Sequence, residues 1–287
     1  FFATLCPMAS SLDPYRCETL AVAWDGDPSN GVLDVRIDRA PQLNSMSAQF
    51  FEDCRQCFER ASTDPQVRCI LLSGNGKLFS AGLELNNLPD FAHVDEAGRR
   101  GLHFYTFIKS WQAAFTAVAE CLRPVIAVIH GACVGGAVDL ISAADIRLCT
   151  QDAWFCIKEV GIGLAADMGT LQRFQKVVGN DSVARELALT ARKMHAPEAV
   201  RIGLVSTVHP TLEECRQAAR GLASVIASHS PLAVVGTKVN LNYSRDHSVA
   251  DGLDFIAAWN AAALQTRDVA VAVEAQLKRA PAVFARL

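Results

Sequence analysis

Residues 124–140 read PVIAVIHGACVGGAVDL, and this stretch decides the fold. Pro124 can stand only at the first position of a strand, and the Val and Ile residues after it suit a strand buried on both faces. Residues 131–137 predict a turn of small residues, and residues 138–144 read as a helix. Asp139 is therefore expected in the first turns of a helix that closely follows a buried strand.

Two further acids follow in equally apolar surroundings. Glu159 comes after the apolar run at residues 154–157, and Asp167 ends the stretch GIGLAAD at residues 161–167. An isolated carboxylate is unfavourable in an apolar environment unless it has a partner or a chemical function. Asp139, Glu159 and Asp167 are therefore candidate functional acids.

Length and composition indicate one large α/β core with an appendage. The chain has 287 residues, of which 51% are hydrophobic and 20% are charged, and this is enough to bury a sizeable core. The formal net charge is -3, so the charge balance does not support nucleic-acid binding.

Cysteine usage predicts a reduced, intracellular protein. The ten Cys residues are irregularly spaced and most lie within apolar segments, which is typical of core residues. Cys54 and Cys57 form a CxxC pattern in a helical context without a second ligand pair, so we expect neither a redox centre nor a metal site.

The sequence predicts no membrane span, because it contains no long uninterrupted apolar run. Residues 1–7 are too short and uncharged for a signal peptide. Ala285, Arg286 and Leu287 resemble the peroxisomal address Ser-Lys-Leu, so a peroxisomal import receptor is a candidate partner. A mitochondrial location is the alternative.

Strands and helices alternate along the first part of the chain, which predicts an α/β fold. Residues 18–24 and 31–38 read as a hairpin, and after residue 211 only helical periodicity remains. We therefore predict an N-terminal extension at 1–14, a core at 15–229 and a helical region at 230–287. The other predicted strands are 68–73, 145–150 and 204–208, and the predicted helices are 47–62, 98–121, 168–177, 182–190, 213–228, 233–242, 249–265 and 269–279.

Two glycine turns each follow a buried strand. The first contains Ser80-Ala81-Gly82-Leu83, and the second contains Gly135-Gly136. Glycine permits the close approach of a ligand to the backbone. Two converging N–H groups would form an oxyanion hole, which stabilises negative charge developing on a carbonyl oxygen.

Taken together, these segments resemble the enoyl-CoA hydratase/isomerase (crotonase) superfamily. Residues 79–85, 124–131, 135–140 and 158–161 carry the resemblance. It implies a crotonase-like spiral of ββα units with C-terminal helices that assemble a homotrimer or a homohexamer. Within the superfamily the chain looks most like the dienoyl-CoA isomerase branch, because Asp139 replaces the first Glu of the hydratases and hydratases lack an acid at the position of Asp167.

The resemblance implies an isomerase that shifts 3,5-dienoyl-CoA to 2,4-dienoyl-CoA in the β-oxidation of unsaturated fatty acids. By similarity, Glu159 acts at C2, Asp167 delivers the proton at C6, and Asp139 orients the pair and holds its charge state. The oxyanion donors would be Leu83 and Gly136. No cofactor is implied, because CoA is part of the substrate. The residues expected to bind the substrate are Ser80, Ala81, Gly82, Leu83, Glu84 and Gly136.

The sequence departs from the family pattern at two positions. Ala137 stands where a third glycine is common, which matters only if residue 137 is an oxyanion donor. Glu84 stands where Asp is usual, which concerns the packing of the first turn.

Three alternatives remain open at this point. Asp139 and Glu159 could instead activate water in a 2-enoyl-CoA hydratase of the same fold. Residues 131–135 also fit the G-x-nucleophile-x-G elbow of hydrolases with Cys133 as nucleophile. The required histidine would then be His195, His209 or His229. The third alternative, a non-enzymatic relative that binds RNA or a partner, is disfavoured by the mild acidity and the intact acid trio.

Overall fold

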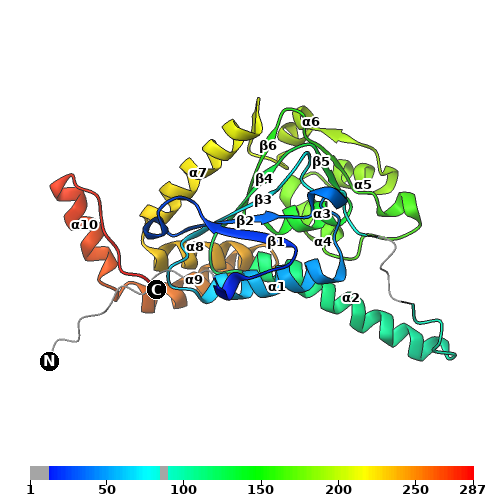
Figure 1. The fold of residues 1–287 in the computed structure, drawn as a ribbon. Coiled ribbons are helices and arrows are strands. Elements are labelled where there is room, and N and C mark those ends of the chain that lie inside the picture. The colour runs from blue at the N-terminus through cyan, green and yellow to red at the C-terminus, as the bar shows by residue number, and fades with distance from the viewer. Residues whose placement is uncertain (1–12, 85–89) are drawn as a thin grey trace.

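The computed structural model describes residues 13–84 and 90–287, and its main sheet has six strands in the order β1-β2-β3-β4-β6-β9 (Figure 1). β1 and β2 pair antiparallel, which confirms the predicted hairpin, and the remaining pairs are parallel. The strands are β1 (Leu20–Trp24), β2 (Val32–Ile37), β3 (Cys69–Gly74), β4 (Val125–Ile129), β6 (Ile146–Thr150) and β9 (Thr207–His209).

Most helices follow the strands as the periodicity predicts, but the short helix at Ala196–Arg201 was not predicted. The first long helix is N-capped by Ser47, whose Oγ accepts a hydrogen bond from the Phe50 N–H at 3.3 Å, and it ends before Asp64-Pro65. The α-helices are α1 (Ala48–Thr63), α2 (Ala97–Glu120), α3 (Gly136–Ala143), α4 (Thr170–Val178), α5 (Asp181–Thr190), α6 (Ala196–Arg201), α7 (Leu212–Ser228), α8 (Pro231–Ser244), α9 (Val249–Ala263) and α10 (Asp268–Lys278).

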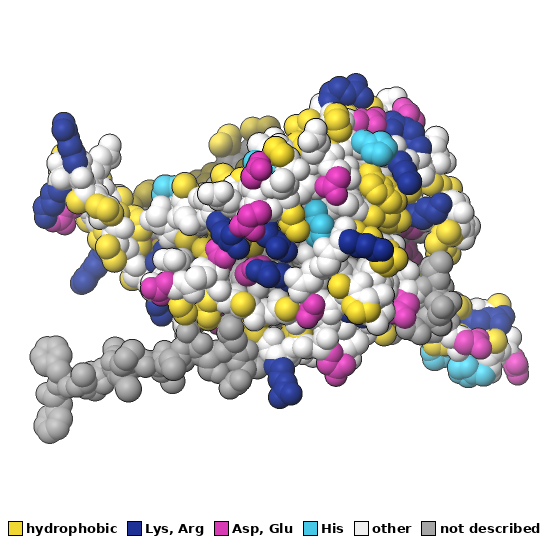
Figure 2. Space-filling view, turned by 45° about the horizontal axis from the view of Figure 1, so that its top comes forward, with side chains coloured by type: hydrophobic (Ala, Val, Ile, Leu, Met, Phe, Trp, Pro, Cys, Tyr) yellow, Lys and Arg dark blue, Asp and Glu magenta, His cyan; other side chains and the backbone are white. Residues whose placement is uncertain are grey.

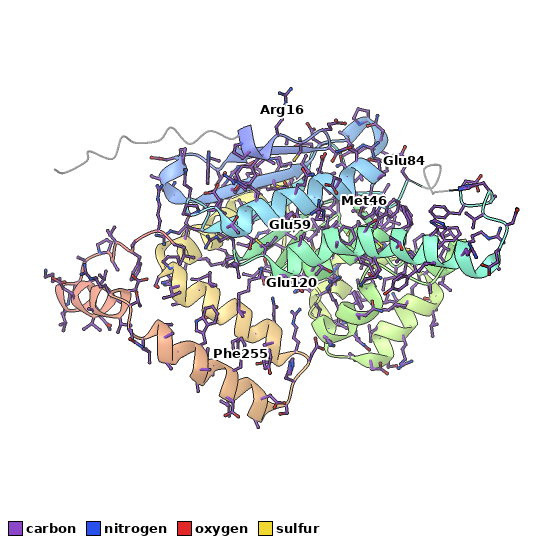
Figure 3. All side chains as sticks on the ribbon, turned by 90° about the horizontal axis from the view of Figure 1, so that it is seen from below. Arg16, Met46, Glu59, Glu84, Glu120 and Phe255 are labelled. Carbon is purple, nitrogen blue, oxygen red and sulfur yellow. The ribbon has the colours of Figure 1, made fainter. Side chains whose placement is uncertain are left out.

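The two faces of the main sheet bury different sets of side chains, because successive strand residues point to opposite sides. Leu71, Ile126 and Leu148 pack against α7 through Ala219 and its neighbours. The alternate residues of the same strands face α1, α2 and α3 in the larger core. Seen from below, α1 and α2 run side by side, with Met46 at the start of α1 near Glu84 (Figure 3).

A second, three-stranded sheet was not predicted. It contains β5 (Ala132–Val134), β7 (Trp154–Cys156) and β8 (Met194–His195) in the order β5-β7-β8. The interpretation of residues 131–137 as a simple turn is therefore wrong, since β5 lies within it. Strands of two or three residues are too short to show a period, and Gly131 and Gly135 on either side of β5, both with positive φ, resemble turn residues.

The C-terminal helices pack against the core to different degrees. Lys238 on α8 is buried, and its Nζ lies 2.7 Å from Asp145 Oδ2 and 3.0 Å from the Arg123 carbonyl oxygen. α9 packs on α8, where the rings of Tyr243 and Phe255 stack at 4.3 Å. α10 and the first turns of α2 project from opposite sides of the body (Figure 2). The boundary near residue 230 stays a prediction.

No single helix within residues 13–84 and 90–287 is long and apolar enough to cross a membrane. α7 and α8 together have suitable length and composition, but they are bent by 110° at the break between them.

Candidate active site

The second sheet brings the two glycine turns together. Ser80 forms a parallel bridge with Cys133 of β5, in which the Ser80 N–H donates to the Ala132 carbonyl at 3.1 Å and the Val134 N–H donates to the Ser80 carbonyl at 3.2 Å. Gly82 has a φ of +90°, and a Cβ there would lie 2.5 Å from the Val134 carbonyl oxygen. Only glycine therefore allows the first turn to approach β5 this closely.

Leu83 and Gly136 present the expected pair of amide donors. The Gly82 carbonyl and the Glu84 N–H both bond to Met46, at 2.8 and 3.0 Å, so the intervening Leu83 N–H faces away from Met46. Gly136 is the first residue of α3, whose opening N–H groups have no acceptor inside the helix. Within the described residues, neither N–H has a hydrogen-bond acceptor. Both are therefore free for a ligand oxygen.

Leu83 and Gly136 both line a cavity of about 440 Å³. Its wall is mainly apolar, and Glu159 and Asp167 stand on it together with Leu83 and Gly136. The lining residues are Phe51, Ala81, Gly82, Leu83, Phe104, Phe107, Ile108, Trp111, Val134, Gly135, Gly136, Lys158, Glu159, Ile162, Leu164, Ala165, Asp167 and Met168. Leu83 and Gly136 thus share one apolar cavity with two carboxyl groups.

Glu159 opens the 3₁₀ helix η5 (Glu159–Ile162) that follows β7. Its Oε1 lies directly against Gly135, because a Cβ there would be 3.0 Å from this oxygen. Its other oxygen, Oε2, is buried and has no hydrogen-bond partner among the described residues. A free buried carboxyl oxygen beside the second glycine turn is suited to reach a ligand atom bound there.

Asp139 of α3 is only 1% exposed and is not among the described residues that line the cavity. Its Oδ1 accepts a hydrogen bond from the Thr170 N–H at 2.6 Å, at the start of α4. Its Oδ2 is buried and finds no hydrogen-bond partner within residues 13–84 and 90–287. The α4 N-terminus therefore holds one oxygen of Asp139 while the other stays available.

Burial raises the pKa of all three carboxyl groups. Desolvation is the largest cause, and it raises the pKa of Glu159 to about 7 and that of Asp139 to about 6. These values already include the neighbouring acids, which raise the pKa of both groups, and the Thr170 N–H, which lowers the pKa of Asp139. The pKa of Asp167 is also raised by burial. Near neutral pH the trio can therefore hold a proton as well as accept one.

The remaining predicted binding residues do not all reach the cavity. Ala81 and Gly82 line it. Ser80 is fully buried behind the wall, where its Oγ donates to the Asn44 carbonyl at 2.7 Å. Glu84 pairs with Arg39 at 3.0 Å, away from the cavity. The structure therefore gives Ser80 and Glu84 roles in shaping the first turn.

Sequence reasoning missed the aromatic side of the cavity. Trp111 and Phe107 of α2 line it, with ring centroids 4.3 Å apart, and Trp111 stacks on Phe51 at 4.1 Å. The helical spacing of apolar residues predicted a helix over residues 98–121. It did not predict that one face of this helix lines a cavity. The aromatic residues at 104, 107 and 111 recur at helical spacing, a pattern that equally fits a buried core face.

The Cys133 hydrolase alternative does not fit this geometry. Cys133 is completely buried within β5, and burial raises the pKa of its thiol well above the ordinary value. Nucleophilic cysteines are instead at least partly accessible and have lowered pKa values.

Comparison with known proteins finds one matching family and several similar named proteins. The profile of the Enoyl-CoA hydratase/isomerase family matches residues 27–284. The mitochondrial Delta(3,5)-Delta(2,4)-dienoyl-CoA isomerase of Rattus norvegicus is 47% identical over 251 residues, which cover 86% of this chain and 77% of the rat protein. The peroxisomal protein of the same name from Arabidopsis thaliana is 44% identical over 262 residues, covering 90% of this chain and 94% of that protein.

A solved structure has a closely similar fold. The crystal structure of a putative enoyl-CoA hydratase from Streptomyces coelicolor A3(2) superposes with a TM-score of 0.84 at 27% identity, covering 98% of both chains.

Proposed function

Because the chain belongs to the enoyl-CoA hydratase/isomerase family and has its crotonase-like α/β fold, we propose that it converts 3,5-dienoyl-CoA to 2,4-dienoyl-CoA. One observation carries this proposal. Two amides that have no acceptor in the described part of the chain line a single apolar cavity with two carboxyl groups, and the third acid is close to one of these. The relatives named as dienoyl-CoA isomerases support this substrate over a simple enoyl-CoA.

Binding places the thioester oxygen between the N–H groups of Leu83 and Gly136. Ionised Glu159 removes a proton from C2, and the electron pair of the C2–H bond moves into a conjugated enolate whose oxygen carries the charge. The two amides stabilise this charge as it develops. The apolar wall excludes water, which strengthens their effect.

The second half of the reaction returns a proton at C6. Protonated Asp167 donates it, and the electrons of the enolate move back so that double bonds remain at C2–C3 and C4–C5. Asp139 raises the pKa of Glu159 through its own charge, so the acids share protons instead of all ionising together. Each turnover leaves Glu159 protonated and Asp167 ionised, and proton exchange between them restores the site. No cofactor takes part apart from the CoA of the substrate.

Asp167→Asn is expected to lose the diene shift, by about 10²–10⁴-fold in kcat, because an amide cannot donate the C6 proton as a carboxylic acid does. The measurement is the growth of the conjugated 2,4-dienoyl absorbance on incubation with a 3,5-dienoyl-CoA. In D₂O the variant should still exchange the C2 proton, since Glu159 is intact.

Near-normal turnover by this variant would rule out the two-carboxylate mechanism. Assaying a 2-enoyl-CoA in parallel tests the alternative, because a hydratase would add water to it and leave the 3,5-diene unchanged.

We further propose that the protein assembles as a homotrimer or as a pair of trimers. Large apolar residues on the C-terminal helices are more than half exposed in the single chain, among them Leu241, Leu253, Leu264 and Val273. A cavity of about 620 Å³ also opens between α8, α9 and α10. Sedimentation should give a mass of three or six chains, and Leu253→Glu should lower it; a monomeric wild-type protein would contradict this.

We propose a peroxisomal location, with the mitochondrion as the alternative. The tripeptide Ala285-Arg286-Leu287 supports the first, and the named relatives include peroxisomal and mitochondrial proteins. In the structure, Arg68 donates hydrogen bonds to the Phe284 and Ala285 carbonyls, so an import receptor would have to compete with this contact. The location of the full chain carrying an internal or N-terminal fluorescent tag decides between the two organelles.

A further inference from the structure

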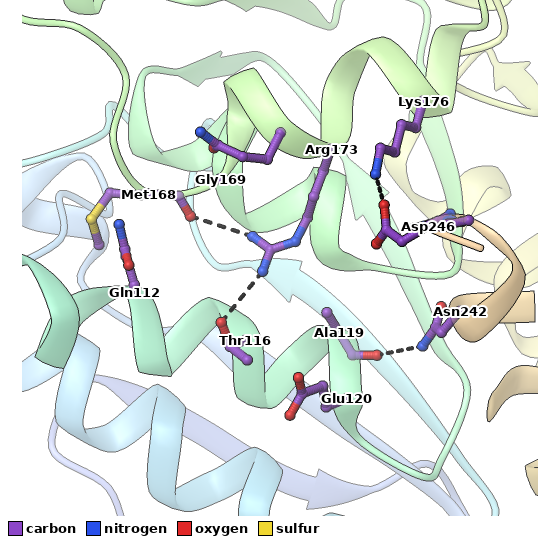
Figure 4. Close-up of a pocket in the computed structure, with 12 residues that line it drawn as sticks. Gln112, Thr116, Ala119, Glu120, Met168, Gly169, Arg173, Lys176, Asn242 and Asp246 are labelled. Atoms are coloured by element: carbon purple, nitrogen blue, oxygen red, sulfur yellow. Dashed lines mark hydrogen bonds and ion pairs between the residues drawn. The ribbon is translucent and has the colours of Figure 1, made fainter.

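The segment that carries Asp167 is the wall between two cavities. Met168 lines both the substrate cavity and a second, more polar cavity of about 560 Å³ that α2, α4 and the end of α8 enclose. From the polar side, two helices hold consecutive carbonyl groups of this wall. Gln112 Nε2 of α2 donates to the Asp167 carbonyl at 2.7 Å. Arg173 Nη1 of α4 donates to the Met168 carbonyl at 3.3 Å (Figure 4).

Arg173 lies flat against the next residue, Gly169. This glycine has a φ of +129°, and a Cβ there would lie 2.0 Å from Arg173 Nη1. The guanidinium thus occupies the space of the missing side chain. The following N–H, that of Thr170, is the donor to Asp139 Oδ1. One arginine therefore holds the backbone that joins Asp167 to the hydrogen bond on Asp139.

The charge of Arg173 is not neutralised by a direct ion pair. It is half-buried, and none of the ion pairs among residues 13–84 and 90–287 includes it. Its second nitrogen donates to Thr116 Oγ1 at 3.4 Å, a neutral acceptor. Close to it, Lys176 is already paired with Asp246 (Figure 4). The positive charge of Arg173 is therefore available to act electrostatically on the acid trio.

We propose that Arg173 is a positioning residue for the diene shift, which fixes the Asp167 segment against Asp139 and supplies positive charge behind the acid trio. This inference rests on the proposed function.

The groups around Asp139 show why this charge matters. Glu159 of η5, Asp167, and Cys133 of β5 face Asp139 and can carry only negative charge, whereas Arg173 of α4 opposes them. Arg173 itself is faced by Glu120 of α2 and by Arg245 after α8. Because Arg173 lowers the pKa of Asp139, removing it should leave the Asp139 carboxyl group protonated to higher pH.

Arg173→Met tests the proposal, with Lys176→Met as the matched control on the same helix. The Met variant should lose about tenfold or more in kcat, and its kcat–pH profile should shift, because Arg173 acts on Asp139 and the charge of Asp139 acts on the pKa of Glu159. Lys176→Met should keep the wild-type kcat and profile. Arg173→Lys should restore the kcat–pH profile but only part of kcat, because an ammonium cannot reproduce the two directed hydrogen bonds.

Gln112→Leu separates the positioning of the Asp167 segment from the effect of the Arg173 charge. It removes only the hydrogen bond to the Asp167 carbonyl, so kcat should fall without a shift in the kcat–pH profile. An Arg173→Met variant with wild-type kcat and a wild-type kcat–pH profile would overturn the proposal. If circular dichroism shows that Arg173→Met misfolds, the folded Arg173→Lys variant is used instead. A wild-type kcat in Arg173→Lys, or a shift of its kcat–pH profile, would then overturn the proposal.

A readout without substrate keeps this test separate from the proposed reaction. Infrared titration of the protonated carboxyl bands, with Asp139→Asn to assign the band, should show Asp139 releasing its proton at higher pH in Arg173→Met. Failure of the wild-type diene assay would refute the proposed function alone, whereas an unshifted Asp139 band would refute the charge role of Arg173.

Discussion

Glu159→Gln is expected to lower kcat/KM for a 3,5-dienoyl-CoA by about 10³-fold, within the range typical of general acid–base groups. Glutamine keeps the shape of the side chain beside Gly135 but cannot accept the C2 proton. The variant should therefore also lose C2–H exchange in D₂O, which Asp167→Asn should retain. This difference assigns C2 to one acid and C6 to the other.

Glu59→Gln is the matched control for this loss, because Glu59 is a carboxylate on the exposed face of α1, paired with Arg55 (Figure 3). It should leave both turnover and exchange unchanged. If Glu159→Gln exchanged the C2 proton normally while Asp167→Asn did not, the two acids would have the opposite roles.

The same Glu159→Gln variant should be more stable than the wild type at about pH 8, on the order of 1–3 kcal/mol. The pKa of Glu159 is about 7 in the folded protein against an ordinary value of 4.5. As the pH rises from 4.5 to about 7, the Glu159 carboxyl ionises first in the unfolded chain. The free energy of unfolding therefore falls over this pH range and stays lowered above it. Urea unfolding should show the gain at pH 8 and little gain near pH 5, and an equal gain at both would exclude ionisation as its cause.

Gly82→Ala is the second change with a large expected effect, a fall in kcat of about 10²–10³-fold, which is typical for loss of one oxyanion donor. The new Cβ would meet the Val134 carbonyl oxygen at 2.5 Å, and a φ of +90° is strained for alanine. The first turn must then move away from β5, and the Leu83 N–H moves with it. Turnover and C2–H exchange should fall together, since both pass through the same enolate.

Gly101→Ala is the matched control, because a Cβ there meets nothing within 4 Å on the exposed side of α2. It should keep full activity and be neutral or slightly stabilising, as expected for Gly to Ala in a helix. Thermal unfolding of both variants separates a local shift of the turn from general loss of folding. Wild-type kcat in a folded Gly82→Ala variant would show that the Leu83 N–H is not an oxyanion donor.

Most of the fold prediction rested on the periodic spacing of apolar residues. The hairpin and helices α1, α2 and α7 to α10 lie within a few residues of their predicted bounds. These elements are long enough to repeat their apolar pattern several times, and Ser47 and Ser230 cap helices where the sequence provides an oxygen acceptor. The short strands β5, β7 and β8 do not repeat any pattern, so the second sheet remained hidden.

For the site, the sequence by itself determined which residue types were available: two glycine turns after buried strands, and Asp139, Glu159 and Asp167 in apolar context. Such local signals follow from the chain's own chemistry. Only the tertiary structure decided that Ser80 bridges to β5, that Trp111 closes the cavity, and that Arg173 stands behind Asp167. These contacts join residues far apart in the chain, and their formation depends on how whole layers pack, which no local pattern specifies.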